Sequence, residues 1–407
     1  MAILSERAKH AVNALHEENA IAEQLERKGK KVIRLNQGDP PLYFPTPEYM
    51  IEEHVRALRE RKTSYAQFSG EPELKEAIAK RYRKHGLRLG HEDVVVTAGV
   101  SEALQFLNQS LIDRGDGAIL FRPYYAPYVP HLRISGGAPV FENYDEKDGW
   151  NIELGHVEGS LRRMRKEGRL RKVKYMLITN PNNPTGTVLR HSVIKEIVDL
   201  ASEYGVLLVS DEIYDEIVYN GAAFTSIGRL ARGVPHVILN GASKNFDATG
   251  LRVGYAVVPE HDKASEAVKL AFSNFASIRI SANRPAQLAL AAAMENGAQH
   301  NEAVTRMTIG IAQRVNYAMK LLKENPHLST VQPNGAFYLF PRIDLKAMRM
   351  GDDATFTRKL LLEEHVQVVR GSGFGSPGHF RMIALPPKED LELAIKRINR
   401  FCKRHAR

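Results

Sequence analysis

The middle of the chain alternates short apolar segments with segments of helical periodicity, and this alternation constrains the fold most. Several of the apolar segments are hydrophobic at nearly every position, which is typical of strands buried on both faces. Seven strands are expected, at Val94–Thr97, Ala118–Phe121, Pro139–Glu142, Lys174–Thr179, Val206–Ser210, His236–Leu239 and Gly254–Val258. Helices are expected between them, for example at Glu102–Ile112, Ser192–Tyr204 and His261–Phe275. The pattern predicts an α/β fold with a mostly parallel, seven-stranded sheet.

The pattern changes after about residue 290. A long helix is expected at Glu302–Asn325, because Pro326 follows it. Further strands are expected at Ala336–Pro341, Val366–Arg370 and Phe380–Leu385, and further helices at Asp353–Glu364 and Lys388–Lys403. The first forty residues lie outside the alternating layer and end at the turn signal Asp39-Pro40-Pro41. We therefore expect a large domain over residues 41–290 and a smaller α+β domain over residues 1–40 and 291–407.

Composition and charge exclude several classes of protein. The net charge is +10 over 407 residues, but Lys and Arg are spread along the chain and mixed with acids. That distribution suits anionic small molecules better than nucleic acid. No apolar run approaches the roughly 20 residues of a membrane helix, and the acidic N-terminal segment fits neither a signal nor a transit peptide. The single cysteine, Cys402, excludes an intrachain disulfide and a cysteine metal cluster, so we expect a cytoplasmic protein without a metal.

Four of the expected strands are followed by residues that can carry chemistry. Gly99-Val100-Ser101 offers backbone amides at a helix start, and Asn180-Pro181-Asn182-Asn183-Pro184-Thr185-Gly186 forms a sharp loop. Asp211 and Tyr214 follow the fifth strand, and Ser243-Lys244 follows the sixth, ahead of Gly250 and Arg252. Taken singly, each has a plain structural alternative: a helix cap, a turn or a surface lysine. Together they predict a ligand crevice at the carboxyl ends of the strands, with Lys244 as a candidate nucleophile.

This combination, with Gly378-His379-Phe380-Arg381 near the C-terminus, resembles the class I aminotransferases, the fold-type-I enzymes that depend on pyridoxal 5'-phosphate. The resemblance covers essentially the whole chain. The flanking segments Asn36–Pro41, Ile278–Asn283 and Gly371–Gly375 are most similar to microbial alanine aminotransferases. Related branches act on aspartate and on aromatic amino acids.

The resemblance implies a role for each matching residue around the cofactor. Lys244 would bind the cofactor covalently and shuttle a proton. Asp211 would pair with the pyridine nitrogen, and Tyr214 and Asn183 would bond the phenolic oxygen. The residues implied around the phosphate and the ring face are Val100, Ser101, Ser243, Arg252, Tyr125 for stacking, and Tyr65 from a second subunit. The active site would therefore depend on a homodimer.

The resemblance also implies how substrates bind. Arg381 would hold the α-carboxylate, with help from Gly38 and Asn183. No residue obviously holds a second, distal carboxylate; Arg279 is the nearby candidate, and the dimer interface is its alternative role. We therefore expect ping-pong transamination from L-alanine to 2-oxoglutarate. The alternatives are an aspartate or aromatic aminotransferase, a carbon–sulfur lyase with the same cofactor and, remotely, a DNA-binding regulator.

Overall fold

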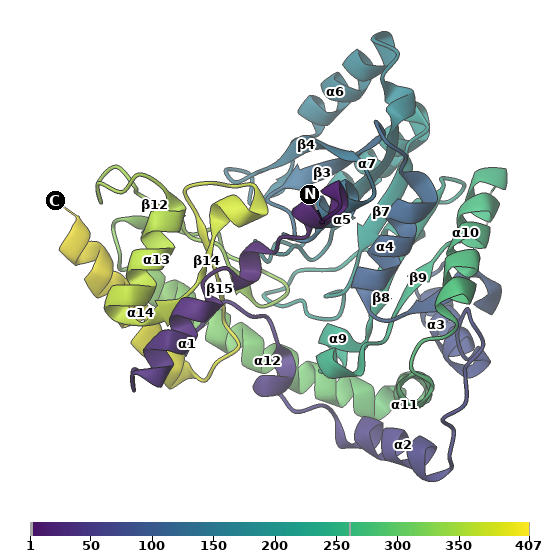
Figure 1. The fold of residues 1–407 in the computed structure, drawn as a ribbon, viewed down its shortest axis with the longest axis horizontal. Helices are drawn as coiled ribbons and strands as arrows, with labels where there is room; N and C mark the ends of the chain where they lie inside the picture. Colours follow the sequence, from purple (N-terminus) through teal and green to yellow (C-terminus); the bar gives the residue numbers. More distant parts are fainter. Residues whose placement is uncertain (1–2, 260–261, 407) are drawn as a thin grey trace.

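A central eight-stranded sheet organises the molecule (Figure 1). The structure is a computed structural model that describes residues 3–259 and 262–406. The strands lie in the order β2-β9-β8-β7-β6-β3-β4-β5. Their bounds are β2 Val94–Thr97, β3 Gly117–Arg122, β4 Ala138–Asp145, β5 Asn151–Ile152, β6 Val173–Thr179, β7 Leu207–Asp211, β8 His236–Gly241 and β9 Gly254–Val257. All seven expected strands are present, and the two-residue β5 adds an eighth at the edge.

Strand direction places the ends that matter on one side of the sheet. The strands β8, β7, β6, β3 and β4 are parallel, whereas β9 is antiparallel to both of its neighbours. Because β2 and β8 are each antiparallel to β9, they run in the same direction as one another. The carboxyl ends of β2, β3, β6, β7 and β8 therefore share one edge of the sheet, and β9 begins there.

Helices cover both faces of this sheet because its strands are apolar on both sides. One face packs against α4 (Val100–Leu111), α5 (Tyr128–Ile134) and α10 (Lys263–Arg279). The helices against the other face are α3 Pro72–Lys84, α6 Leu154–Lys166, α7 His191–Tyr204, α8 Ile227–Leu230 and α11 Arg284–Glu295. The helix α11 packs against α3 and also against α2 (Glu48–Arg59). The expected helix at His261–Phe275 corresponds to α10, and its proposed first residue lies outside the described residues.

A second hydrophobic cluster joins residues near the N-terminus to residues after 300. Its helices are α12 Gly297–Leu322, α13 Asp353–Glu364 and α14 Lys388–His405, and its strands are β1 Ile33–Arg34, β10 Leu328–Ser329, β11 Tyr338–Leu339, β12 Arg342–Ile343, β13 Val366–Gln367 and β15 Phe380–Ile383. The adjacent strand β14 Val369–Arg370 packs Val369 into the cluster of the large sheet. The strands β11, β15 and β14 form a small sheet, and β1 pairs with β13. The expected strand at Val366–Arg370 is thus split in two, and that at Ala336–Pro341 is shorter than expected. The exact domain boundaries stay a prediction.

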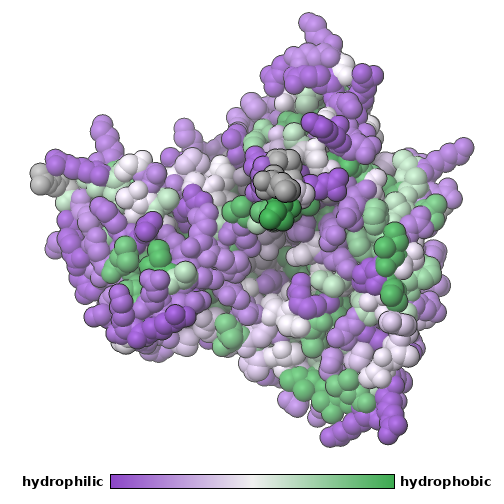
Figure 2. All heavy atoms as spheres, viewed as in Figure 1, coloured by the Kyte–Doolittle hydropathy of each residue, from purple (hydrophilic) through white to green (hydrophobic). Residues whose placement is uncertain are grey.

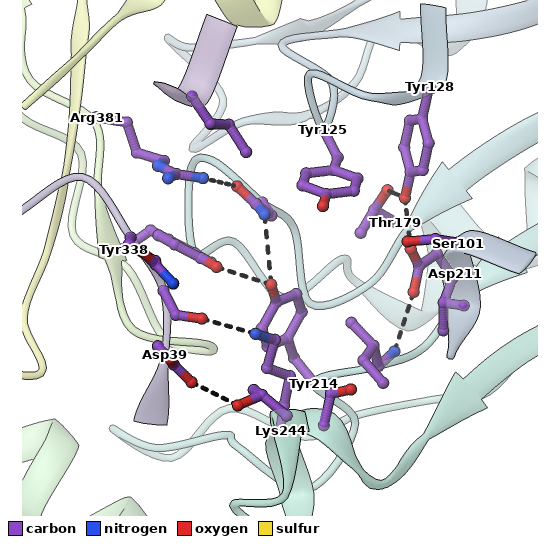
Figure 3. Close-up of a pocket in the computed structure, with 18 of the residues that line it drawn as sticks. Asp39, Ser101, Tyr125, Tyr128, Thr179, Asp211, Tyr214, Lys244, Tyr338 and Arg381 are labelled. Atoms are coloured by element: carbon purple, nitrogen blue, oxygen red, sulfur yellow. Dashed lines mark hydrogen bonds between the residues drawn. The ribbon is translucent and has the colours of Figure 1, made fainter. Parts of the chain in front are cut away.

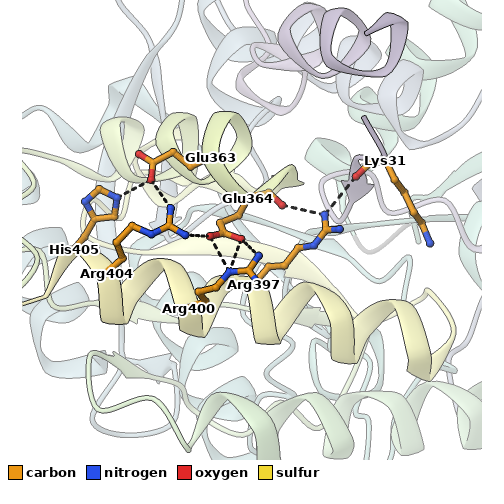
Figure 4. A network of polar contacts seen from close by, with 7 residues as sticks. All are labelled: Lys31, Glu363, Glu364, Arg397, Arg400, Arg404 and His405. Atoms are coloured by element: carbon orange, nitrogen blue, oxygen red, sulfur yellow. Dashed lines mark hydrogen bonds and ion pairs between the residues drawn. The ribbon is translucent and has the colours of Figure 1, made fainter. Parts of the chain in front are cut away.

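An ion-pair network holds the last two helices and the N-terminal segment together (Figure 4). The buried carboxylate of Glu364 accepts from Arg400 Nε at 3.0 Å and from Arg404 Nη2 at 2.7 Å. Arg397 Nη1 donates to the backbone oxygens of Glu364 and Lys31, at 3.0 and 3.4 Å. The buried Glu364 carboxylate thus holds α14 against α13, and Arg397 of α14 also binds the backbone just before β1.

The N-terminal segment crosses from this cluster toward the sheet (Figure 1). It contains α1 (Asn19–Arg27) and two short 3₁₀ helices, η1 (Glu6–His10) and η2 (Ala14–His16), and η1 lies against α5. Hydrophilic residues cover most of the face in Figure 2, with hydrophobic residues gathered in patches. Within the described residues, no helix combines the length and apolar character that crossing a bilayer requires.

We predict that Gly254→Ala lowers the free energy of unfolding by about 1–3 kcal/mol, the usual cost of overpacking. A Cβ on Gly254 would lie 2.6 Å from the Gly99 carbonyl carbon and 2.8 Å from the Val100 nitrogen, and backbone atoms cannot move aside. Urea unfolding followed by circular dichroism measures the change. Gly155→Ala is the control, because its added Cβ has no neighbour within 4 Å. Equal stability of the two variants would contradict the prediction.

Candidate active site

A cavity of about 260 Å³ lies at the sheet edge where the strand ends meet (Figure 3). Residues that follow β2, β3, β6, β7 and β8 line it, together with residues from the N-terminal segment and from β11 and β15. The sequence-predicted site residues that line this cavity are Gly38, Val100, Ser101, Tyr125, Asn183, Asp211, Tyr214, Ser243, Lys244, Arg252 and Arg381. Tertiary folding thus gathers residues separated by more than 300 positions in the chain.

Tyr65 is the one predicted site residue that lies outside the cavity. Its side chain is 77% exposed on the loop between α2 and α3, beside Ser64 and Arg284. Such exposure in a single chain is compatible with the predicted contribution to a second subunit, which stays a prediction.

Lys244 enters the cavity from α9 (Ala242–Asn245), a single helical turn that follows β8 directly. Its Nζ donates to the Gly38 backbone oxygen at 2.7 Å. Burial lowers the pKa of Lys244 to about 8, and the positive charges of Arg381 and Arg252 act in the same direction. At pH 7 roughly a tenth of this lysine is therefore a neutral, nucleophilic amine, far more than for a lysine with its ordinary pKa.

Asp211 ends β7 and is buried at the back of the cavity. Its Oδ2 accepts from the Tyr128 hydroxyl at 2.6 Å, and its Oδ1 accepts from the Ile213 amide at 3.2 Å. The same Tyr128 hydroxyl lies 2.9 Å from Thr179 Oγ1 (Figure 3). Burial raises the pKa of Asp211 to about 6, although these two donors and the positive charge of Lys244 act in the opposite direction.

An anion-binding corner forms where α4 begins. The backbone amides of Val100 and Ser101 belong to the first turn of α4, so they lack acceptors inside the helix. Gly99 caps this turn with φ +85, and a side chain there would collide with Arg252 Nη2, 2.5 Å away. Arg252 donates to the Thr249 and Ala98 oxygens and, among the described residues, has no carboxylate partner. Ser243 adds a hydroxyl to the same cavity.

Arg381 forms a second anion-binding corner from β15. Its side chain is buried, and its guanidinium lies between the rings of Tyr338 and Phe374, 4.6 and 4.8 Å from the ring centroids. Nη1 donates to Asn183 Oδ1 at 3.0 Å and Nη2 to the Asn36 oxygen at 2.5 Å, while Nε has no partner. The described residues offer no carboxylate to this cation, so the cavity suits a carboxylate ligand.

Several cavity residues were missed by the sequence analysis. Tyr128 and Thr179 support Asp211, and Tyr338 contacts Tyr214 through their hydroxyls at 2.8 Å. Leu15 and His16 reach the cavity from the N-terminal segment. Tyr128 follows Tyr125 by three positions at the start of a helix, a spacing that could have revealed it. The others carry no signal in the sequence, because long-range packing alone brings them to the cavity.

Arg279 does not line the cavity. Its Nη1 pairs with Glu102 Oε2 at 2.8 Å, and its Nη2 donates to the backbone oxygens of Phe68 and Val96, each at 3.1 Å. These contacts tie the end of α10 to α4 and β2. In a single chain, Arg279 is therefore occupied away from any substrate in the cavity.

Comparison with known proteins identifies the family. The family model for aminotransferase class I and II matches residues 30–398. The chain belongs to this family. The resemblance noted in the sequence is thereby confirmed, and the eight-stranded, mostly parallel sheet is that of a fold-type-I aminotransferase.

Relatives of this aminotransferase include enzymes named for different donors. A glutamate–pyruvate aminotransferase of Escherichia coli is 32% identical over 384 residues, covering 93% of this chain and 92% of the relative. An aspartate aminotransferase of Geobacillus stearothermophilus is 34% identical over 390 residues, covering 95% of each. The solved structure of an alanine aminotransferase from Pyrococcus furiosus has a TM-score of 0.92 at 37% identity, covering 98% of this chain and 100% of that chain.

Class I aminotransferases depend on pyridoxal 5'-phosphate, and so does this enzyme. The cavity fits that cofactor on three counts. The amides of α4 and the unpaired Arg252 suit a phosphate, and the partly neutral Lys244 suits an aldehyde. Asp211 lacks a cation that a protonated ring nitrogen would supply.

We predict that Tyr128→Phe raises the pKa of Asp211 above about 6, because the lost hydroxyl stabilises the ionised carboxylate. Hydrogen bonds to charged groups contribute about 1.5–3 kcal/mol, or roughly 1–2 pH units. The affinity of the apoprotein for pyridoxal phosphate should decline as pH falls through this pKa, so its acid limb should move upward. Absorbance titrations at several pH values measure it.

Tyr175→Phe is the matched control for this measurement. It removes another buried hydroxyl, which donates to Asn108 Oδ1 at a distance of 2.8 Å. Neither residue lines the cavity. The acid limb of this variant should match that of the wild type. If the acid limbs of the wild type, Tyr128→Phe and Tyr175→Phe coincide, Tyr128 does not set the pKa of Asp211.

Proposed function

We propose that this aminotransferase moves the amino group of L-alanine to 2-oxoglutarate. The observation that carries the proposal is the buried Arg381 guanidinium, which lacks a carboxylate partner among the described residues and faces the cavity that contains Lys244. Every amino donor and oxo acid acceptor offers an α-carboxylate to such a group. The remaining residues then divide between cofactor and substrate.

In this proposal the residues at the strand ends would hold the cofactor. The Val100 and Ser101 amides, Ser243 and Arg252 hold its phosphate, and Tyr65 of a second subunit reaches the same group. When bound, pyridoxal phosphate supplies the electron-withdrawing ring that stabilises the carbanion formed at the substrate's α-carbon.

The ring itself is held from three sides. Asp211 would keep the ring nitrogen protonated, Tyr214 and Asn183 would donate to the phenolic oxygen, and Tyr125 would stack on the ring. The contacts among these residues support this division, since Asn183 Nδ2 lies 3.3 Å from the Tyr214 hydroxyl and Asp211 is already held by Tyr128.

Lys244 moves the proton in this scheme. Its lowered pKa of about 8 gives a neutral fraction that could take the proton from the substrate's α-carbon and deliver it to the cofactor. Arg381 holds the α-carboxylate, with the Gly38 backbone and Asn183 beside it, so that the α-carbon faces Lys244. The oxo acid of the donor leaves before the acceptor binds, which is a ping-pong sequence.

The charges around the cavity support alanine as donor. The lysine and arginine side chains that line it are Lys244, Arg252 and Arg381, and each has a role in the scheme above. Arg279 pairs with Glu102 instead of facing the cavity. Among the described residues, no further lysine or arginine lines the cavity to bind a distal carboxylate, which favours a donor with a small, uncharged side chain. The same lack applies to the distal carboxylate of 2-oxoglutarate, so the choice of acceptor rests on the names of the relatives.

The relatives' names support the same pair of substrates. The Escherichia coli relative is named for glutamate and pyruvate, which are the products expected from 2-oxoglutarate and alanine. The relatives named for aspartate, at similar identity, favour aspartate as the second candidate donor. We further propose that the protein is a cytoplasmic homodimer, and its single, buried cysteine, Cys402, supports the cytoplasmic location. We also propose domains at residues 41–290 and at 1–40 plus 291–407, which the separate hydrophobic clusters of the two parts support.

We predict that the purified holoenzyme forms glutamate from 2-oxoglutarate faster with alanine than with aspartate. The reason is the lack of a free lining cation for a distal carboxylate. A coupled glutamate assay with each donor measures kcat/KM. Lys244→Ala is the inactive control, because the nucleophile is absent.

Higher kcat/KM with aspartate would replace alanine by the second candidate. Cofactor-dependent release of a thiol without any need for 2-oxo acid would indicate a lyase and overturn the proposal. Full turnover by Lys244→Ala would show that another lysine binds the cofactor.

We predict that Tyr65→Ala and Lys244→Ala, each nearly inactive alone, partly complement when their subunits are mixed. Tyr65 is exposed in one chain and Lys244 is buried in the cavity, so a mixed dimer would contain one site with both residues intact. Unfolding and refolding equal amounts together should restore about one quarter of wild-type activity, from random pairing of subunits. Full activity of a monomer in sedimentation would contradict the shared site.

A further inference from the structure

Tyr338 lies where the small sheet approaches the cavity, and none of the roles above includes it. It belongs to β11, which pairs with β15 through Tyr338↔Ile383 and Leu339↔Met382. Side chains alternate along a strand, and opposed residues point to the same side of the sheet. Tyr338 and Arg381 therefore point to the same side, toward the cavity (Figure 3).

The Tyr338 side chain closes a ring of contacts around the carboxylate-binding arginine. Its hydroxyl lies 2.8 Å from the Tyr214 hydroxyl, and its ring covers the Arg381 guanidinium at 4.6 Å. Arg381 donates to Asn183 Oδ1, and Asn183 Nδ2 lies 3.3 Å from the Tyr214 hydroxyl. Four side chains from both sheets are thus linked in a closed circuit.

The donors in this circuit have a fixed direction. Arginine can only donate, so the amide end of Asn183 that faces Arg381 is its oxygen. The NH₂ group of Asn183 therefore faces Tyr214 and donates to one lone pair of its hydroxyl. The second neighbour of that hydroxyl is Tyr338.

The contact between the two tyrosines could run in either direction, and each direction leaves one hydroxyl proton without an acceptor among the described residues. Tyr338 is buried, and within the described residues its hydroxyl has Tyr214 as its only hydrogen-bond partner. If Tyr214 donated to Tyr338, the Tyr338 proton would be buried without an acceptor, which is costly. If Tyr338 donates, its proton is satisfied and the Tyr214 proton faces the cavity, where the phenolic oxygen of the proposed function would accept it.

We propose that Tyr338 is a positioning residue that, with Asn183, fills both lone pairs of the Tyr214 hydroxyl and so directs its single proton at an anionic oxygen of the cofactor. This rests on the proposed function, in which Tyr214 donates to the phenolic oxygen. Donation by Tyr338 also strengthens Tyr214 as a donor, because linked hydrogen bonds polarise one another. The ring of Tyr338 separately supports Arg381.

The test is a pH titration of the visible absorbance of the lysine-bound cofactor. A donor on the phenolic oxygen stabilises its anionic form, so weakening the donor raises the pH at which the chromophore loses its proton. Tyr214→Phe should raise the midpoint by about 1 pH unit. Tyr338→Phe keeps the ring over Arg381 but removes the hydroxyl, and should raise the midpoint by about 0.2–0.5 unit.

A double variant and a control distinguish positioning from general damage. Tyr338→Phe combined with Tyr214→Phe should titrate like Tyr214→Phe alone, because Tyr338 acts through Tyr214. Tyr219→Phe is the control, because it removes a buried hydroxyl that donates to the Gly335 oxygen at a distance of 3.1 Å and does not line the cavity. It should titrate like the wild type. Tyr338→Leu also removes the ring, and should raise the donor KM roughly 2- to 30-fold above that of Tyr338→Phe.

A wild-type midpoint in Tyr338→Phe, or shifts that add in the double variant, would overturn the role of Tyr338 while leaving the proposed function intact. A wild-type protein that shows no absorbance from a lysine-bound cofactor would overturn the proposed function, and the role of Tyr338 with it.

Discussion

The active site of this aminotransferase depends on buried charges that the described chain does not itself neutralise. Arg381 and Asp211 are both buried, and neither contacts an oppositely charged group among the described residues. Burying an unpaired ion costs several kcal/mol, which the rest of the fold must offset. A carboxylate beside Arg381 and a protonated ring nitrogen beside Asp211 would relieve that cost. Binding of these two ligand groups would therefore offset the cost of burying the Arg381 and Asp211 charges.

The rest of the architecture holds these charges in position. The antiparallel β9 makes β2 and β8 run alike, so the start of α4 and the turn that carries Lys244 lie at the same sheet edge. Burial there lowers the pKa of Lys244 to about 8. The second sheet contributes Arg381 and Tyr338, and Asn183 joins the two through bonds to Arg381 and Tyr214. The side chains that we propose for cofactor and for substrate thus share one polar network.

Much of this could be predicted from the sequence because it is written in local patterns. Several of the seven strands are nearly continuous apolar runs, and polar residues or glycine follow them, so Asp211 and Lys244 stand out at once. The short edge strand β5 escaped prediction because two residues are too few to show a repeat of apolar positions. The expected strand at Val366–Arg370 is split because β13 pairs with β1 and β14 with β15, a choice between distant partners that local propensity does not encode.

The sequence alone determined the family, the parallel sheet and the identity of the residues at the strand ends, because each depends on short spacings along the chain. Only the tertiary structure decided that Tyr128 holds Asp211, that Arg279 pairs with Glu102, and that Tyr338 meets Tyr214. Those contacts join residues between 83 and 177 positions apart. They follow from how helices and sheets pack, which fixes side-chain neighbours that no local pattern records.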